Sequence, residues 1–394
     1  MSRSESSFAA RRSPGSRRNA AAIASLLFIA TSAAAQSTQS KYFPPPGQWA
    51  HKSPASLGMD SVKLQEAIEF ANAHASTWDF DRDQVRTFGR PLGPLPKTRA
   101  GTNGIILRHG YIVAQFGDTK ANDPVYSVAK SFLSTVASVA VAKGLIKNVT
   151  DPVANYIHDG GYDSPHNAAI TWKNHLQQES EWEGTIWGKN ADFVGVEEFG
   201  NGRRQPRAIQ APGTFYEYND ARINRFALSL LRLFRAPLPD VLKTSIMDPI
   251  GASQEWHWVP YANSNVTIDD KEMWSVSGGT RWGGGLWINS EDLARFGLLI
   301  LDHGNWNGKQ LVSEQWLRDA TTPSAHGPDY GYLWWLNTKR QQWPSAPASS
   351  FAAIGNGSNT IWIDPEHDIV FVWHWHQGSV DGMIQRILAS VVGP

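Results

Sequence analysis

Residues 126–132 read Tyr-Ser-Val-Ala-Lys-Ser-Phe, and this stretch decides how the rest of the sequence is interpreted. It opens an apolar run that predicts a long helix from about Ser127 to Lys143, ended by Gly144. Because they are three residues apart, Ser127 and Lys130 share one face of that helix. The helix N-terminus favours negative charge at the Ser127 hydroxyl, and a lysine on a buried helix needs a partner or a chemical role. We interpret Ser127 as a candidate nucleophile beside a cation; the alternative is a helix cap beside a solvated lysine.

A second candidate lies in residues 212–220, Pro-Gly-Thr-Phe-Tyr-Glu-Tyr-Asn-Asp, at the start of a helix predicted over 219–233. A Pro-Gly turn followed by aromatic residues places the phenol of Tyr218 on a loop. Tyr218 would carry protons between Ser127 and a leaving group if a cation such as Lys130 lowered its pKa. The alternative is a packed aromatic ring whose hydroxyl group is satisfied.

A third candidate is the small-residue stretch 352–358, Ala-Ala-Ile-Gly-Asn-Gly-Ser, which leads into a hairpin predicted over 360–375. Gly355 would let a substrate approach the backbone closely. The N–H group of Asn356, at a strand edge, would then donate to an oxyanion beside the N–H group of Ser127. The alternative is an ordinary glycine turn.

In their order and spacing, these three motifs resemble the serine β-lactamase and penicillin-binding-protein superfamily. The resemblance is nearest to its class C-like branch of esterases, D-amino-acid peptidases and 6-aminohexanoate-oligomer hydrolases. The superfamily pattern is Ser-x-x-Lys on a helix, Tyr-x-Asn roughly ninety residues later, and a Lys- or His-x-Gly strand near the C-terminus. The resemblance covers about residues 55–390. It implies a metal-independent serine hydrolase without a cofactor, with catalytic residues Ser127, Lys130 and Tyr218 and with oxyanion or substrate contacts from Gly355, Asn356 and Asp220.

Two positions depart from the superfamily pattern. Where Tyr-x-Asn is expected, the sequence has Tyr218-Asn219-Asp220. An aspartate near Lys130 would keep the lysine charged, which favours Tyr218 as the base and leaves Lys130 as an electrostatic aid. Where the superfamily has Lys or His, the sequence has Ala353. Because that position helps relatives to bind a substrate carboxylate, the change favours esters or simple amides over β-lactams and carboxy-terminal peptides.

The composition excludes several classes of protein. With 41% hydrophobic and 18% charged residues in 394, the chain is expected to fold rather than to be disordered. Lys plus Arg and Asp plus Glu are both 36, so the formal charge is zero, which argues against a nucleic-acid partner. The sequence has no cysteine, which excludes disulfides, a thiol nucleophile and cysteine-bound zinc.

The N-terminus has the pattern of a secretory signal peptide over residues 1–35. Arg11, Arg12 and Arg17-Arg18 precede a short apolar run, and Ala33-Ala34-Ala35 follows it. The run is too short to span a bilayer, so we expect a periplasmic or secreted protein without a membrane span after cleavage. The Arg17-Arg18 pair leaves both the general and the twin-arginine export routes open.

The remaining pattern predicts an α/β (α+β) fold. We expect an extended lead-in at 36–60, a sheet domain from 61–144 and 321–394, and a mostly helical domain at 145–320. Hairpins at 104–116 and 360–375 would join one antiparallel sheet, flanked by terminal helices at 61–74 and 379–392. A further helix is predicted over 290–301, with Ser290 as its N-cap and a glycine-rich approach to a short strand before it.

Other clusters gave weaker signals. His374 and His376 alternate on a predicted strand, so both are expected to point to one face, which suits either a metal pair or ordinary packing. The glycine runs at 278–279 and 283–285 lack the residues of a phosphate-binding loop. Three acidic residues near two tryptophans are candidates for a catalytic glutamate: Glu179, Glu181 and Glu183. Four further tryptophans would either line a substrate pocket or pack in the core: Trp256, Trp258, Trp334 and Trp335.

We therefore predict an exported serine hydrolase that cleaves a small-molecule ester, amide or peptide-like bond through an acyl-enzyme. The alternative from another class is a non-catalytic ligand- or cell-wall-binding module, because both departures also fit a site that has lost activity. A histidine-based metallohydrolase is a third possibility.

Overall fold

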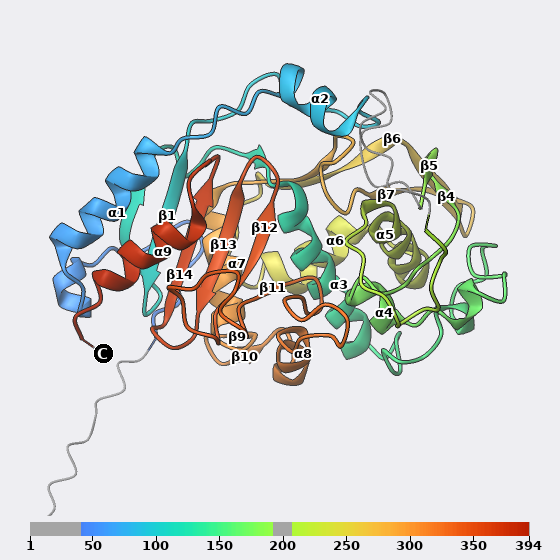
Figure 1. Ribbon diagram of the computed structural model, residues 1–394. Helices are drawn as coiled ribbons and strands as arrows, with labels where there is room; N and C mark the ends of the chain where they lie inside the picture. The colour runs from blue at the N-terminus through green and yellow to red at the C-terminus, as the bar shows by residue number, and fades with distance from the viewer. Residues whose placement is uncertain (1–40, 192–206, 394) are drawn as a thin grey trace, which may run out of the picture. The chain divides into compact units, whose positions relative to one another are not determined.

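The structure is a computed structural model that describes residues 41–191 and 207–393. Its central element is an antiparallel six-stranded sheet (Figure 1). The hairpins predicted over 104–116 and 360–375 are present, and they join one sheet because β14 pairs with β1. In spatial order the strands are β11 (Trp335–Leu336), β12 (Phe351–Gly355), β13 (Asn359–Asp364), β14 (Ile369–His374), β1 (Asn103–Arg108) and β2 (Tyr111–Phe116).

Apolar side chains cover both faces of this sheet. In β1, Ile105 and Leu107 face one core and Ile106 faces the other. Helices α1 (Ser61–Ala73) and α9 (Val380–Ala389) contact each other against the second face, and α7 (Ser290–Leu301) packs on β13, β14 and β1. The predicted antiparallel sheet flanked by terminal helices, and with it the α/β (α+β) class, is confirmed.

The N-cap of α7 is Asn289, so the prediction of Ser290 was wrong by one residue. The Asn289 side chain accepts from the N–H of Asp292 at 2.8 Å, while the Ser290 hydroxyl donates to Asn103 at 2.6 Å. Both residue types cap helices well, and the sequence alone does not tell which of the two has the extended backbone of a cap.

The other described residues form further helices and a second sheet. The helices are α2 (Val85–Phe88), α3 (Ala129–Ala142), α4 (Trp172–Leu176), α5 (Asp220–Phe234), α6 (Leu238–Leu242) and α8 (Glu314–Ala320). The second sheet has the order β3 (Asp123–Pro124), β8 (Gly285–Ile288), β6 (His257–Ile268) and β7 (Lys271–Val276). Short hairpins are β4 (Thr185–Ile186) with β5 (Lys189–Asn190), and β9 (Asn305–Trp306) with β10 (Lys309–Gln310). Across the described ranges, none of the helices has the length and apolar character needed to cross a membrane.

The long strand β6 and its partner β7 are absent from the predicted elements of 145–320, where mainly helices were expected. Pro260 lies inside β6, and the pairing with β7 shifts register between Pro260 and Asn265. A proline and a register shift both remove the simple alternation by which a strand is recognised. The predicted domain boundaries stay a prediction.

One buried arginine fixes the lead-in to α7. The guanidinium group of Arg295 donates to the carbonyl oxygens of Pro44, Pro45 and Gln48 at 2.8, 2.8 and 3.0 Å. It also donates to the carbonyl oxygen of Ile250 at 3.0 Å. Charged donors form strong hydrogen bonds with carbonyl groups. This one side chain therefore supplies the hydrogen bonds that a neighbouring strand would otherwise give to these carbonyl oxygens.

Replacing Arg295 with methionine is expected to lower the free energy of unfolding by about 3 kcal/mol, because four carbonyl oxygens lose their donor. Urea denaturation measures the change. Arg318→Met is the matched control, since that side chain is 56% exposed and pairs only on the surface of α8. It should change stability by less than about 0.5 kcal/mol. An Arg295→Met loss below about 1 kcal/mol would contradict this role for the arginine.

Candidate active site

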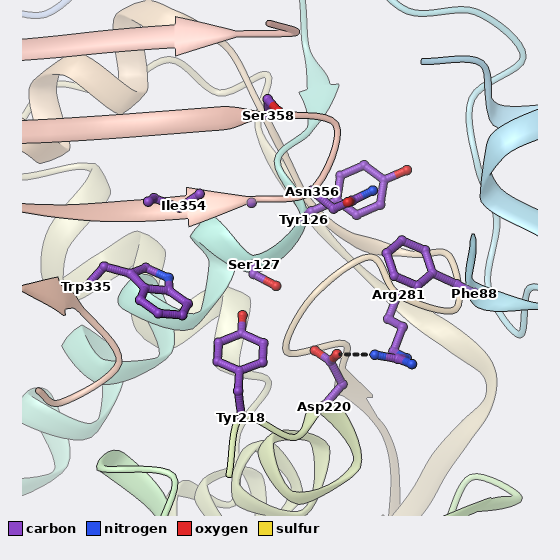
Figure 2. A pocket seen from close by; sticks show the side chains of 11 residues that line it. Phe88, Tyr126, Ser127, Tyr218, Asp220, Arg281, Trp335, Ile354, Asn356 and Ser358 are labelled. Carbon is purple, nitrogen blue, oxygen red and sulfur yellow. Dashed lines mark hydrogen bonds and ion pairs between the residues drawn. The ribbon is translucent and has the colours of Figure 1, made fainter. Parts of the chain in front are cut away.

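Ser127 lies in a 3₁₀ turn, η3 (Tyr126–Val128), directly before α3. Tyr126, the residue before it, has a φ of +52°, in the left-handed region that a non-glycine side chain rarely adopts. Two hydrogen bonds hold this turn: the Tyr126 hydroxyl donates to Gln84 at 2.7 Å, and the N–H of Val125 donates to Leu286 at 2.9 Å. The strained turn directs the Ser127 hydroxyl into a cleft (Figure 2).

Lys130 is buried beneath this serine, with 1% of its side chain exposed. Its Nζ donates to Ser127 Oγ at 2.8 Å and to Asp220 Oδ1 at 2.6 Å, and it lies 4.8 Å from the centre of the Tyr218 ring. Burial acts to lower the pKa of Lys130, but the negative charge of Asp220 and hydrogen bonding outweigh it, so the pKa is raised. The lysine is therefore held as an ammonium ion.

Tyr218 approaches Ser127 from the loop before α5, whose N-cap is Asn219. Its hydroxyl group is directed toward Ser127 (Figure 2), and its ring stacks on Trp335 with the centroids 5.6 Å apart. Burial raises the pKa of Tyr218, although the charge of Lys130 and hydrogen bonding with Ser127 act to lower it. The phenol is therefore protonated at neutral pH.

Asp220 completes the cluster between two cations. Its Oδ1 accepts from Lys130, and its Oδ2 accepts from Arg281 at 3.2 Å (Figure 2). Burial alone would raise the pKa of Asp220, but the charges of Lys130 and Arg281 lower it overall. Asp220 is therefore an ionised partner of Lys130, and it also lines the cleft.

Gly355 and Asn356 lie at the end of β12, beside the serine turn. A Cβ atom on Gly355 would lie 2.0 Å from the carbonyl oxygen of Val125 and 3.0 Å from the nitrogen of Ser127. Only glycine allows this strand to approach the turn so closely. The structure therefore brings together six residues whose chemical roles stay predictions: Ser127, Lys130, Tyr218, Asp220, Gly355 and Asn356.

The cleft above these residues has a volume of about 380 Å³. Figure 2 places Trp335 and Ile354 on one side of Ser127 and Phe88 on the other. The lining residues are Phe88, Tyr126, Ser127, Tyr218, Asp220, Arg281, Trp335, Ile354, Gly355, Asn356 and Ser358.

Sequence reasoning missed two residues of the 277–281 loop. Arg281 lines the cleft and pairs with Asp220. Gly279 touches the centre of the cluster: a Cβ atom there would lie 3.1 Å from Lys130 Nζ and 3.4 Å from Ser127 Oγ. The run Ser-Gly-Gly-Thr-Arg at 277–281 was weighed only as a phosphate loop, whereas its glycines serve a close approach to buried side chains.

The histidine pair does not lie on one face, so that expectation was wrong. Trp375 has a φ of +54°, which breaks the alternation of β14. His376 stacks on Trp373, which belongs to the core beneath α1 and α9. His374 instead shares the face of Val372, two residues before it on β14, which belongs to the other core. Burial lowers the pKa of His374 to about 3 and that of His376 to about 4. Within residues 41–191 and 207–393, no group of three or more His, Asp or Glu side chains is placed to hold a metal ion.

The glutamates and most of the tryptophans lie away from the cleft. Glu181 accepts from Arg207 at 2.6 Å and from Arg222 at 2.5 Å in a buried ion-pair network. Glu183 lines a separate cleft. Trp256, Trp258 and Trp334 are core residues, and of the four weighed tryptophans only Trp335 lines the cleft with Ser127.

Comparison with known proteins identifies the family and the fold of this chain. The model of the beta-lactamase family matches residues 118–388, which is more than half of the chain. A putative beta-lactamase from Bacteroides dorei has a TM-score of 0.58 at 13% identity, covering 85% of this chain and 99% of that one. A putative 6-aminohexanoate-dimer hydrolase from Bacillus anthracis has a TM-score of 0.56 at 14% identity, with coverages of 90% and 89%. A D-stereospecific amidohydrolase from a Streptomyces species has a TM-score of 0.53 at 15% identity, with coverages of 84% and 98%. At these identities the solved structures establish a shared fold.

Replacing Gly355 with alanine is expected to slow acylation of Ser127 by about a hundredfold or more, because the new methyl group forces β12 away from the turn. The rate of reaction with a fluorophosphonate probe measures this. Gly101→Ala is the control, since nothing lies within 4 Å of a Cβ atom there. Equal labelling rates for the two variants would contradict the close approach.

Proposed function

This chain belongs to the beta-lactamase family, and we propose that it is an exported serine hydrolase that cleaves esters or simple amides through an acyl-enzyme on Ser127. One observation carries the proposal. The Oγ of Ser127 lies 2.8 Å from a buried ammonium group, and the phenol of Tyr218 is directed at the same oxygen. A hydroxyl group beside a fixed cation, with a phenol that becomes a proton acceptor when it ionises, can act as an activated nucleophile.

The proposed first step forms a bond between Ser127 Oγ and the substrate carbonyl carbon. The serine proton passes to Tyr218 in its ionised form, and the carbonyl electrons move to the oxygen. The N–H groups of Ser127 and Asn356 donate to that oxyanion. Tyr218 then returns the proton to the leaving alcohol or amine as the bond to carbon breaks. Water, deprotonated by Tyr218, then attacks the acyl carbon. As the bond between that carbon and Ser127 Oγ breaks, Tyr218 returns the proton to Ser127 and the acid is released.

Lys130 stays charged throughout this scheme. Its ammonium hydrogens are engaged by Ser127 and Asp220, and its raised pKa leaves no lone pair to accept a proton. Its charge stabilises both the tyrosinate and the developing oxyanion. The substitution of Asp220 for the asparagine of the superfamily pattern therefore fits a tyrosine base rather than a lysine base.

The proposed substrate class follows from Ala353 and the cleft. Ala353 is buried in the core, so no cation is offered from that position to a substrate carboxylate. The walls on the two sides of Ser127 are largely apolar. Export is proposed from the signal-peptide pattern at 1–35, which lies outside the described residues.

Intact-mass measurement after incubation with a fluorophosphonate probe is expected to show one adduct on the wild type and none on Ser127→Ala. A reactive serine is required for such an adduct. An adduct that persists in Ser127→Ala, or a wild type that never reacts, would overturn the mechanism.

A hydrolysis panel distinguishes the alternatives. The panel contains short-chain p-nitrophenyl esters, D-amino-acid amides and a chromogenic β-lactam, and we expect turnover of the esters or amides. Saturable binding without turnover would favour the non-catalytic binding module, and activity lost to a chelator would favour the metallohydrolase.

The rate constant kcat/KM is expected to rise with pH from neutral into the alkaline range. Burial raises the pKa of Tyr218, so the tyrosinate that accepts the serine proton becomes more abundant as pH increases. Tyr218→Phe should lose activity by about a thousandfold and lose the alkaline rise. A pH profile that falls through the same range, or one unchanged in Tyr218→Phe, would exclude tyrosine as the base.

A further inference from the structure

We propose that two residues of the segment 78–95, here called the strap, serve the active site: Gln84 positions the strap, and Phe88 selects the substrate group on one side of the scissile bond. This inference rests on the proposed function. The strap precedes the family match, which begins at residue 118, and the sequence predicted only a polar connection there.

Gln84 joins the two loops that carry the candidate catalytic residues. It is fully buried. Its Oε1 accepts from the Tyr126 hydroxyl at 2.7 Å, and its Nε2 donates to the carbonyl oxygens of Thr280 and Arg281 at 3.2 and 2.7 Å. One amide therefore links the turn before Ser127 to the loop that contacts Asp220. Both polar atoms of the amide are used, so a side chain of another shape would leave buried groups unpaired.

The strap has its own core, and Tyr126 belongs to it. Trp78 lies edge-on to the Tyr126 ring at 5.8 Å, and Phe80 lies edge-on to Trp375 at 5.7 Å. This small cluster is separate from the two cores of the main sheet. Aromatic pairs of this geometry fix ring positions, so the contact with the strap helps to hold Tyr126 in its left-handed conformation.

Backbone hydrogen bonds fix the far end of the strap to the glycine-rich loop. The N–H groups of Leu92 and Gly93 donate to the carbonyl oxygen of Trp282 at 2.7 and 3.0 Å. In return, the N–H of Gly284 donates to Pro94 at 2.7 Å. A Cβ atom on Gly93 would lie 2.9 Å from the carbonyl oxygen of Pro260. The strap is therefore closely packed at both ends of α2.

Between these anchors, α2 places Phe88 in the wall of the cleft. Its ring lies 5.3 Å from the guanidinium carbon of Arg281 and 6.2 Å from the Tyr126 ring, which fixes its position. Trp335 and Ile354 line the opposite side, with Ser127 between (Figure 2). A carbonyl group attacked by Ser127 would thus have apolar surface on both sides. The geometry fits an ester or amide with an apolar or aromatic group at each end of the scissile bond.

The test compares two preferences measured as ratios of kcat/KM. The acyl preference is p-nitrophenyl hexanoate over p-nitrophenyl acetate. The leaving-group preference is phenyl acetate over ethyl acetate, followed with a pH indicator. We expect Phe88→Ala to reduce one preference by about tenfold and to change the other by less than about twofold. Trp335→Ala should show the reverse pattern. Ratios cancel any general loss of rate, including loss through the contact of Trp335 with Tyr218.

Gln84 is tested as a positioning residue. Gln84→Met should reduce the same preference as Phe88→Ala, and the double variant should show less than the product of the two effects. Gln84→Glu keeps the acceptor for Tyr126 and should be intermediate; it replaces Gln84→Met if that variant does not fold. Arg86→Ala, whose side chain on α2 is 73% exposed, is the control and should keep both wild-type ratios.

Each outcome decides the inference. An active wild type whose two preferences are unchanged, or equally reduced, in Phe88→Ala overturns the role of the strap and leaves the proposed function intact. The same holds if Arg86→Ala alters the ratios as Phe88→Ala does. A wild type without turnover of any of these esters and without a fluorophosphonate adduct overturns the proposed function, and this inference falls with it.

Discussion

The buried ammonium group of Lys130 is the interaction on which the site depends. An ammonium group with almost no solvent contact is costly unless oxygen atoms replace its water. Ser127 and Asp220 supply those oxygens at 2.8 and 2.6 Å. Because Lys130 comes from α3 and Asp220 is the first residue of α5, the same contacts join two helices ninety residues apart in the sequence. The proposed chemistry and the packing of the helices therefore use the same charges.

Two glycines let the backbone close around this centre. Gly355 brings β12 against the nitrogen of Ser127, and Gly279 brings the 277–281 loop against Lys130. The position of β12 is set by the main sheet, whose central strands are buried on both faces. The strap contributes the remaining wall. The main sheet thus supplies the proposed oxyanion position. A segment outside the family match supplies Phe88, where, under the proposal, variation would change the choice of substrate.

The sequence allowed prediction of the features that depend on local pattern. The Ser127–Lys130 spacing, the Pro-Gly turn before Tyr218 and the two hairpins of the main sheet carry short-range signals. Features that depend on tertiary packing were not predictable in this way. Arg281 is recognised as a site residue only through its contact with Asp220 in the folded chain. Gln84 is recognised only through its hydrogen bonds to three groups that are distant in the sequence. The prediction that His376 shares a face with His374 was wrong because the left-handed backbone of a single residue, Trp375, breaks the alternation of the strand.

The protonation state of Lys130 is the most direct test of this account. A pH titration by nitrogen-15 NMR of the lysine Nζ resonances, with Lys130→Arg for assignment, measures it. The account predicts that Nζ of Lys130 stays an ammonium ion across the neutral and mildly alkaline range, because the charge of Asp220 raises its pKa. Loss of that proton near neutral pH would contradict the account and would assign the base to lysine rather than to tyrosine.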